Sequence, residues 1–474
     1  MTDGRTPHQA LDAPTLAISR GAQFVTLTAA FLGWMFDGLE MGLFPLVARP
    51  ALRELMGAAA DSNIGTWMAW ITAGFLVGAA CGGILFGWLG DRVGRVRAMV
   101  WSVLTYAIFS GLCGFAETPL QLALLRFVAA LGMGGEWSLG VALVMEVWPS
   151  KSRPMLAGLI GAASNVGFLL IAVVGLGLSQ FIEGAADALR SAGLSEDWVI
   201  KLIGSDRSGW RLLMFIGATP ALLTVFVRMF VPESKLWQHA AAHAPKARVR
   251  DIFAPGIRHK TILGTCLGGM ALIGTWASIQ WVTPWSNKLA AGTASASTAA
   301  STTQISLAIG AIVGTLGAAY FAEWFSRRKS YFVLCLLSLV VCAYLYRSPL
   351  NFGLTGPWLE RVDPNHDLFG GALQFNWQFI IVAGIAGCVT ASFYGWLPLY
   401  LPELFPTRIR ATGQGFAFNF GRVLAAIGAL QSGRLLDYFN EDYARMGGIM
   451  SLVYVFGMVL IWFCPETKGQ PLPE

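Results

Sequence analysis

The stretch Gly87-Trp-Leu-Gly-Asp-Arg-Val-Gly-Arg-Val-Arg97 is a short hydrophilic segment between two apolar runs, each long enough to cross a membrane. It contains three arginines, Arg92, Arg95 and Arg97. Because lysine and arginine accumulate in the cytoplasmic loops of membrane proteins, this segment is expected to be a cytoplasmic turn. Its placement fixes the direction of every other apolar run, since successive spans alternate in direction.

The composition argues against an ordinary soluble domain. Of the 474 residues, 55% are hydrophobic and 13% are charged, and the mean hydropathy is +0.58. One soluble core cannot bury this much apolar surface, so the sequence predicts a multi-pass protein of the inner or plasma membrane. The net charge of +6 is spread over short loops, which argues against a nucleic-acid-binding face. The seven cysteines show no metal-ligand spacing, and we expect neither a metal nor a cofactor.

Apolar stretches of roughly 20 residues predict an all-α membrane protein with twelve spanning helices. Six lie in residues 22–231 and six in 261–464, joined by a basic linker at 232–260 and flanked by tails at 1–21 and 465–474. Basic residues concentrate in the linker and in the turns on one side, so both termini are predicted to be cytoplasmic. The spans are expected at 22–47, 64–88, 98–116, 120–148, 155–180, 209–231, 261–285, 303–325, 331–346, 376–401, 412–431 and 447–464.

The two sets of six helices carry matching loop motifs. Glu146-Val-Trp-Pro-Ser-Lys-Ser-Arg153 follows the fourth span, and Glu403-Leu-Phe-Pro-Thr-Arg-Ile-Arg410 follows the tenth with the same spacing of acid, proline, hydroxyl and two bases. Pro232-Glu-Ser-Lys235 closes the sixth span as Pro465-Glu-Thr-Lys468 closes the twelfth. A weaker repeat matches Asp91 and Arg95 with Glu323 and Arg327, an acid and a base at the same spacing. Repeats at equivalent positions predict two six-helix halves in parallel repeat.

The opening stretch fits Gly-x-Leu-x-Asp-Arg-x-Gly-Arg-x-Arg and resembles the signature loop of the major facilitator superfamily. The resemblance implies a transporter that holds its substrate between two six-helix halves near the membrane midplane. Gly132-Met-Gly-Gly-Glu-Trp137 and Leu401-Pro-Glu-Leu-Phe-Pro-Thr-Arg-Ile-Arg-Ala-Thr-Gly413 resemble the bacterial metabolite:proton symporters. Asp37-Gly-Leu-Glu40 is similar to the Asp-Gly-x-Asp of aromatic-acid and sialate symporters, with glutamate in place of the second aspartate. The Pro-Glu motifs after the sixth and twelfth spans resemble those of sugar porters.

Charged residues inside predicted spans are candidates for proton coupling, because an ionisable group near the bilayer centre costs several kcal/mol. Asp37 and Glu40 share one helix face, and helix rise places Asp37 about 22 Å from the cytoplasmic start of its span and Arg126 about 10 Å from the outer start of its own. Either acid can therefore pair with Arg126, as a permanent ion pair or as one broken by a proton. The resemblance to sugar porters implies the pair Asp37–Arg126. Glu136 is interpreted as a second proton site, a substrate contact or a hydrogen-bonding group between helices.

Arg422 is the strongest cation predicted inside the second half. An arginine in a watery cavity can hold a carboxylate by two parallel hydrogen bonds, so it is a candidate anchor for an anionic substrate. The alternative is a structural partner for an acid such as Glu136. Aromatic and amide side chains of the neighbouring spans, including Trp281 and Trp396, are further candidates for the cavity. The predicted substrate-binding residues are Asn165, Trp276, Gln280, Tyr394, Asn419 and Arg422.

The acids and bases of the predicted cytoplasmic loops resemble the salt-bridge set that closes the inner side of facilitators. An inside-positive topology explains the bases but not the acids among them. The predicted gate residues are Asp91, Arg95, Glu146, Arg153, Glu233, Glu403 and Arg410.

These patterns favour a proton-coupled symporter of a small organic anion, with a sugar or polyol transporter as the alternative. An enzyme is not expected, because the sequence shows neither a metal-ligand cluster nor a nucleophile with a base. The expected partners are a small-molecule substrate, protons and the lipid bilayer, without nucleic acid. The family resemblance implies a monomer.

Overall fold

The computed structural model describes residues 19–57, 60–204, 209–219, 221–243, 247–290, 299–346, 377–440 and 442–473. Within these ranges the regular structure is helical throughout. The tail residues 1–18 and the segment 347–376 lie outside the described residues.

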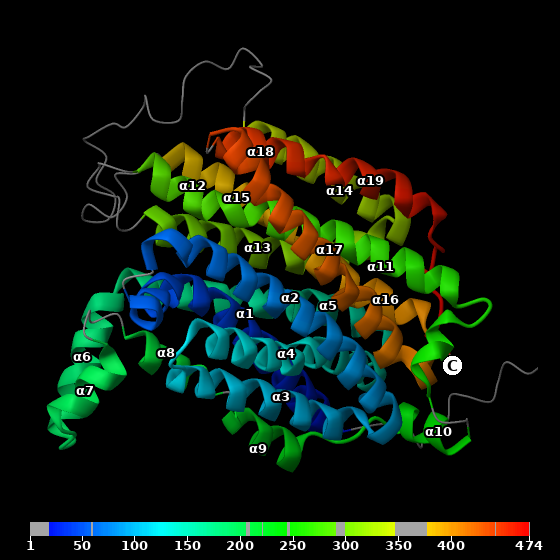
Figure 1. The fold of residues 1–474 in the computed structure, drawn as a ribbon. Coiled ribbons are helices and arrows are strands. Elements are labelled where there is room, and N and C mark those ends of the chain that lie inside the picture. The colour runs from blue at the N-terminus through cyan, green and yellow to red at the C-terminus, as the bar shows by residue number, and fades with distance from the viewer. Residues whose placement is uncertain are drawn as a thin grey trace, which may run out of the picture.

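The helices form two groups that lie side by side in Figure 1. The first group runs from α1 to α9 and the second from α11 to α19, with α10 in the connection between them (Figure 1). The bounds of the first group and the connection are α1 Arg20–Met56, α2 Ala60–Val93, α3 Arg95–Leu112, α4 Pro119–Val147, α5 Arg153–Leu176, α6 Leu178–Ser191, α7 Glu196–Ile203, α8 Trp210–Ile216, α9 Ala221–Phe230, α10 Lys235–His243 and the short η6 Val249–Phe253. Those of the second group are α11 Arg258–Ile273, η7 Gly274–Ser278, η8 Ile279–Trp281, α12 Val282–Leu289, α13 Ala299–Trp324, α14 Arg327–Tyr346, α15 Trp377–Ala391, α16 Phe393–Leu404, η9 Thr407–Ile409, α17 Arg410–Tyr438, α18 Tyr443–Ser451, α19 Val453–Leu460 and η10 Ile461–Phe463.

Nine helical segments of the described residues are long and apolar enough to cross a membrane. A tenth is counted if the two parts of α1, which bend by 53° between Phe44 and Ala48, form one span. The expected span at 209–231 is divided into α8 and α9, and the one at 412–431 lies in α17, whose Asn419 and Arg422 reduce its apolar character. The number twelve therefore stays a prediction.

Helix breaks occur where the chain lines the space between the groups. The expected span at 261–285 is α-helical to Ile273, then passes through a π-helical turn at Gly274–Ser278 and a tight turn at Ile279–Trp281. Such turns inside an α-helix are frequent at functional sites, because they redirect side chains and free backbone groups. The expected span at 376–401 is likewise divided between α15 and α16.

Two glycines are needed by the fold, one for its backbone conformation and one for a close contact between helices. Gly94, which separates α2 from α3, has a φ of 114°, a value that side-chain-bearing residues rarely adopt. In α4, a Cβ atom on Gly134 would lie 1.9 Å from the carbonyl oxygen of Ala79 in α2. The glycine therefore lets these two helices touch backbone to backbone, as small residues do in membrane bundles.

The two groups meet along two pairs of helices, α2 with α17 and α5 with α13. In the repeat, α13 is the counterpart of α2 and α17 that of α5. The two contacts are thus the same contact made twice, as a two-fold axis between the groups would give.

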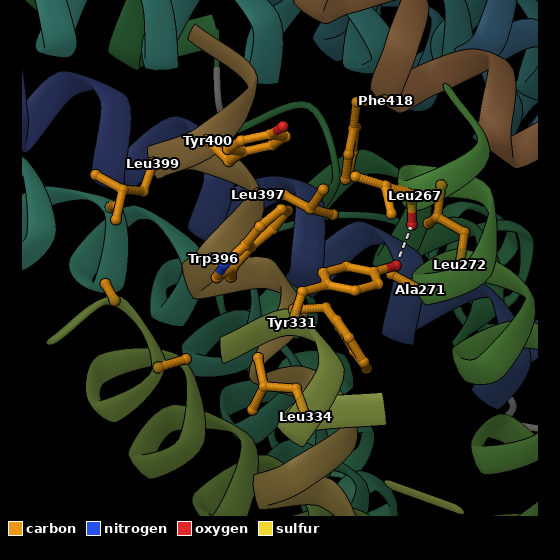
Figure 2. Packing of buried hydrophobic residues seen from close by; sticks show 14 of the residues in the cluster. Leu267, Ala271, Leu272, Tyr331, Leu334, Trp396, Leu397, Leu399, Tyr400 and Phe418 are labelled. Atoms are coloured by element: carbon orange, nitrogen blue, oxygen red, sulfur yellow. Dashed lines mark hydrogen bonds between the residues drawn. The ribbon is translucent and has the colours of Figure 1, made fainter. Parts of the chain in front are cut away.

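Aromatic side chains fill the core of the second group. Trp396 is fully buried, with its ring centroid 4.7 Å from that of Tyr331 and 4.5 Å from that of Tyr400. The Tyr331 hydroxyl donates a hydrogen bond of 2.8 Å to the carbonyl oxygen of Leu267, which ties α14 to α11 (Figure 2). Trp396 is therefore a packing residue and does not line the cavity for which it was a candidate.

Candidate functional site

A cavity with an empty volume of about 850 Å³ lies between the two helix groups. Its wall comes from α1 and α5 of the first group and from α11, α13, α15, α16, α17 and the broken turns η7 and η8 of the second. Most of the lining is apolar, and the polar side chains are few, which is the usual make-up of a small-molecule site. The polar and charged lining residues are Ser164, Asn165, Thr275, Gln280, Gln304, Thr390 and Arg422, and the aromatic ones are Trp34, Phe168, Trp276, Tyr394 and Phe418.

Arg422 is the cation of this cavity. Its side chain is 3% exposed, and its Nη1 has no hydrogen-bond partner among the described residues. The guanidinium lies 5.6 Å from the ring centroid of Phe418, and the acid whose charge acts on it is Asp37. A buried arginine with an unused donor facing a cavity is prepared to bind an acceptor.

Asp37 and Glu136 form a buried pair of carboxyl groups beside Arg422. They are 1% and 2% exposed and lie close enough to hydrogen-bond to each other if one of them carries a proton. No donor among the described residues reaches either oxygen of Asp37. Glu136 reaches α1 because Gly33, one turn before Asp37, has no side chain: a Cβ atom there would lie 1.8 Å from the Glu136 carboxyl oxygen.

Arg126 pairs with Glu40 rather than with Asp37. Its Nη1 lies 2.9 Å from Glu40 Oε1, and both side chains are almost completely buried. The guanidinium also lies 4.1 Å from the ring centroid of Phe44 and 5.1 Å from that of Phe75. The pair Asp37–Arg126 implied by the sugar-porter resemblance is therefore not the one that forms. Depth along the helices left both acids possible, and the rotation of α1 decides between them.

An aromatic cluster lies at one side of the cavity. The rings of Trp137 and Phe418 stack with centroids 3.8 Å apart and an interplanar angle of 17°. Trp34 contacts both rings, at centroid distances of 6.0 and 6.1 Å. Because Trp34 and Trp137 belong to the first helix group and Phe418 to the second, this cluster joins the two groups next to the cavity.

At the end of the bundle where α2 passes into α3, buried ion pairs connect the two groups. Glu146 Oε1 accepts from Arg95 Nη2 at 3.1 Å and from Arg410 Nη1 at 3.0 Å, and all three side chains are fully buried. Asp91 pairs with Arg95 and accepts from the amide of Thr412 at 2.7 Å. Since Arg410 and Thr412 belong to the second group, these bonds close this end of the molecule, which we call the α2–α3 end.

The repeat-related cluster of the second group stays within that group. Glu403 accepts from Arg327 at 2.8 Å and from the Thr467 hydroxyl at 2.6 Å. Among the described residues, Arg153, the repeat counterpart of Arg410, makes no ion pair with Glu403 and acts on it through its charge. The two halves therefore contribute unequally to closure.

Glu233 and Glu466 cap equivalent helices. Glu233 accepts from the amide of Arg95 at 2.9 Å, and Glu466 from the amide of Arg327 at 3.0 Å. Burial raises the pKa of Glu233, although the amides oppose it. For Glu466, burial would raise the pKa, but the backbone amides outweigh burial and the pKa is lowered. The predicted gate residue Glu233 thus caps the start of α3, and its bonds among the described residues go to the amides of Arg95, Val96 and Ser234.

Comparison with known proteins settles the family. The family described as sugar (and other) transporter matches residues 25–250 and 262–468, most of the chain. The chain belongs to this family. Its members are major facilitator transporters and not enzymes, so the protein is a transporter with a small-molecule substrate, and its apolar helices lie in the inner membrane.

Three relatives of this transporter are named for the small organic molecules that they transport. It is 27% identical over 445 residues to a probable 4-methylmuconolactone transporter of Cupriavidus pinatubonensis, covering 94% of this chain and 91% of the relative. It is 27% identical over 459 residues to a cis,cis-muconate transport protein of Acinetobacter baylyi, covering 93% and 94%. It is 25% identical over 438 residues to the sialic acid transporter NanX of Escherichia coli, covering 92% of each.

Solved structures confirm the fold. The proton:xylose symporter XylE superposes with a TM-score of 0.69 at 16% identity, covering 95% of this transporter and 98% of that chain. The human organic anion transporter MFSD10 superposes with a TM-score of 0.61 at 15% identity, covering 93% and 99%. These identities are too low to transfer a substrate.

The predicted site residues of the transporter fall into distinct places. Asn165, Trp276, Gln280, Tyr394 and Arg422 all line the cavity. Asn419 does not, because its Nδ2 donates to the carbonyl oxygens of Gly134 in α4 and Gly415 in α17, at 3.0 and 3.1 Å. Trp281 packs beside Tyr443 instead, with centroids 6.2 Å apart.

Sequence reasoning missed four polar residues of the cavity wall: Ser164, Thr275, Gln304 and Thr390. Gln304 stands at the expected start of its span, where a polar residue is usually interpreted as the end of a helix. A glutamine one turn inside α13, among small residues, was the available signal.

Proposed function

We propose that the transporter is a proton-coupled symporter of a small organic carboxylate that works by alternating access. The observation that carries this proposal is Arg422, a buried guanidinium that lines the cavity and keeps Nη1 without a hydrogen-bond partner among the described residues. A carboxylate entering the cavity would satisfy this donor and compensate a buried charge at once.

The buried charges supply a reason for proton coupling. Asp37, Glu40 and Glu136 are three acids, and Arg126 and Arg422 are two bases, so full ionisation leaves one negative charge without compensation. One proton on the Asp37–Glu136 pair removes it and allows the two carboxyl groups to hydrogen-bond. A substrate carboxylate at Arg422 adds negative charge to this cluster and therefore favours proton uptake. By reciprocity, the bound proton strengthens binding of the anion.

The cavity also indicates the shape of the substrate. Helix rise places Arg422 about 18 Å from the start of α17, and Gln304 about 30 Å from the end of α13 at the same end of the bundle. By Cα position, Gln304 thus lies about 12 Å farther from the α2–α3 end than Arg422 does. Gln304 Oε1 accepts from the Thr283 hydroxyl at 3.1 Å, which leaves its NH₂ group to donate to a ligand. An acid with an acceptor at its far end and an apolar middle fits this arrangement.

A neutral sugar or polyol is the second candidate. The observation that favours it is the set of amides Asn165, Gln280 and Gln304 in the cavity wall, since amides hydrogen-bond hydroxyl groups readily. The names of the relatives favour the acid, because muconate and sialic acid both carry a carboxylate.

The membrane topology belongs to the same proposal: twelve spans, two six-helix halves at 22–231 and 261–464, and both termini cytoplasmic. Arg92, Lys151 and Arg408 all lie at the α2–α3 end, which agrees with the accumulation of basic residues on the cytoplasmic side. Labelling of single cysteines placed in the turns, in intact cells and in inverted vesicles, tests this orientation.

Uptake by the purified protein in liposomes tests the function. A pH gradient is imposed across liposomes, and muconate, benzoate, sialate, nicotinate and xylose are offered in turn. The proposal expects uptake of at least one acid that rises with the gradient and collapses with an uncoupler. Uptake of xylose with no uptake of any acid would favour the second candidate and reject the first.

The role of Arg422 is tested by Arg422→Lys, which keeps the charge but loses the two-pronged donor geometry. We expect KM for the transported acid to rise at least tenfold. The matched control is Arg434→Lys, an exposed position farther along α17. An unchanged KM in Arg422→Lys would refute the anchoring role.

A further inference from the structure

A second cavity lies at the α2–α3 end, away from the substrate site. It has an empty volume of about 1390 Å³. We call it the arginine groove, and its lining residues are Trp88, Arg92, Ala247, Arg248, Val249, Asp251 and Arg408.

The groove carries a net positive charge. Arg408 Nη1 lies 2.6 Å from Asp251 Oδ2, so one arginine is balanced by the single acid of the lining. Burial would raise the pKa of Asp251, but the hydrogen bonds from Arg408 and the Arg248 amide outweigh it and lower the pKa, which keeps the acid ionised at neutral pH. Arg92 and Arg248 are exposed and supply two further positive charges. The sum is about two positive charges on one concave surface.

The groove stands where the lipid-facing surface ends. Along α2, Val77 and Leu85 are 38% and 46% exposed, and Trp88 and Arg92 follow on the same side at helical spacing. In a membrane transporter this exposed apolar stripe faces the hydrocarbon, so Arg92 lies at the depth of the headgroups. The Arg92 guanidinium lies 5.0 Å from the ring centroid of Trp88, and tryptophan favours this interface.

An apolar track leaves the groove on the α17 side. Phe253, two residues after Asp251, packs edge-on against Phe416 with centroids 5.2 Å apart. Phe416 stacks on Phe420 at 5.1 Å, and Phe253 and Phe420 are 45% and 37% exposed. These three rings continue from the basic groove onto the outer face of α17, which suits an acyl chain below a charged headgroup.

We propose that the arginine groove binds the phosphate of an anionic phospholipid, with an acyl chain along Phe253, Phe416 and Phe420. Guanidinium groups bind phosphate through paired hydrogen bonds, and basic pockets between membrane helices suit anionic headgroups. The groove is built from both helix groups and the linker, since Arg92 lies in the last turn of α2, Arg248 and Asp251 belong to the linker and Arg408 belongs to η9. A lipid bound there holds the two groups together and favours closure of the α2–α3 end.

Native mass spectrometry of the full-length transporter in detergent tests the proposal with defined lipids. The probes are phosphatidylglycerol and phosphatidylcholine with identical acyl chains, and inorganic phosphate. The test variant is Arg92→Gln with Arg248→Gln. The matched control is Arg97→Gln with Arg250→Gln, which removes two exposed arginines outside the groove, one in the first turn of α3 and one in the linker.

We expect the test variant to bind phosphatidylglycerol about 30-fold more weakly, equivalent to about 2 kcal/mol, because each arginine near an anionic headgroup contributes about 1 kcal/mol. The control and phosphatidylcholine binding are expected to be unchanged. The same lipid should raise the Tm of the wild-type protein but not that of the test variant. Equal retention of phosphatidylglycerol in both double variants would overturn the proposal. So would an equal loss of phosphatidylcholine, or displacement of the lipid by millimolar inorganic phosphate, which would assign the groove to free phosphate.

Discussion

Replacement of Glu146 by glutamine tests whether Glu146 contributes more than its repeat counterpart Glu403 to closure of the α2–α3 end. Among the described residues, one carboxylate oxygen of Glu146 accepts from both Arg95 of the first group and Arg410 of the second, at 3.1 and 3.0 Å, and all three side chains are fully buried. Arg95 keeps its pair with Asp91, whereas Arg410 is left with the carbonyl oxygen of Pro473 at 2.8 Å. The loss therefore acts mainly on the bond between the groups.

Removing one partner of a buried ion pair destabilises the state that contains the pair by about 3 kcal/mol, which is the lower end of the usual range. The Arg410 bond can form only while the α2–α3 end is closed, so this energy is lost from the closed state alone. The ratio of open to closed molecules should then rise about 150-fold. That shift is enough to make an open state visible if the wild type populates it at about one per cent.

Hydrogen–deuterium exchange of the full-length protein measures this shift. The amides of Ala411 and Thr412 donate to Asp91 across the interface, at 3.2 and 2.7 Å, so they are protected only in the closed state. Peptides covering 409–415 and 85–97 should exchange faster in Glu146→Gln. The matched variant is Glu403→Gln, at the repeat-related position, whose bonds to Arg327 and Thr467 stay within one half. Faster exchange in both variants to the same extent, or in neither, would refute the argument.

Four further predictions concern the membrane interior. Asp37→Asn should abolish uptake driven by a pH gradient while substrate exchange at equal pH continues, and gradient-driven accumulation by this variant in liposomes would remove Asp37 from the proton site. In a double-mutant cycle, Glu40→Gln and Arg126→Gln should each lower the thermal stability in detergent, with a coupling of about 3 kcal/mol between them; additive effects would show that the 2.9 Å pair contributes no net energy. Gln304→Leu should raise the inhibition constant of adipate several-fold and leave that of hexanoate unchanged, because only adipate carries an acceptor at its far end; equal changes for both acids would place Gln304 outside the binding site. Gly134→Ala should lower Tm, since its Cβ atom would lie 1.9 Å from a backbone oxygen, whereas Gly74→Ala, with nothing within 4 Å, should leave Tm unchanged or raise it.

The sequence alone determined the class of this protein and identified part of its candidate site. Its hydrophobic runs are too long and too many for a soluble core, and this alone places it in a membrane. The repeated loop motifs predicted two matching halves, and the comparisons confirmed the superfamily. Asp37, Glu40, Arg126, Glu136 and Arg422 became candidate functional residues because they are ionisable groups inside apolar runs. Burying such a group in the bilayer costs several kcal/mol, so it is expected only where it has a role.

Only the tertiary structure decided which of these charges meet. Helical depth made Asp37 and Glu40 equivalent partners for Arg126, but the rotation of α1 about its axis gives Arg126 to Glu40 and turns Asp37 towards Glu136 and Arg422. It likewise decided that Asn419 contacts the backbone of α4 and that Gln304 lines the cavity. Spacing along a helix fixes height and approximate face, whereas the neighbour across a gap depends on how two helices pack, and that is set by side chains far away in the sequence.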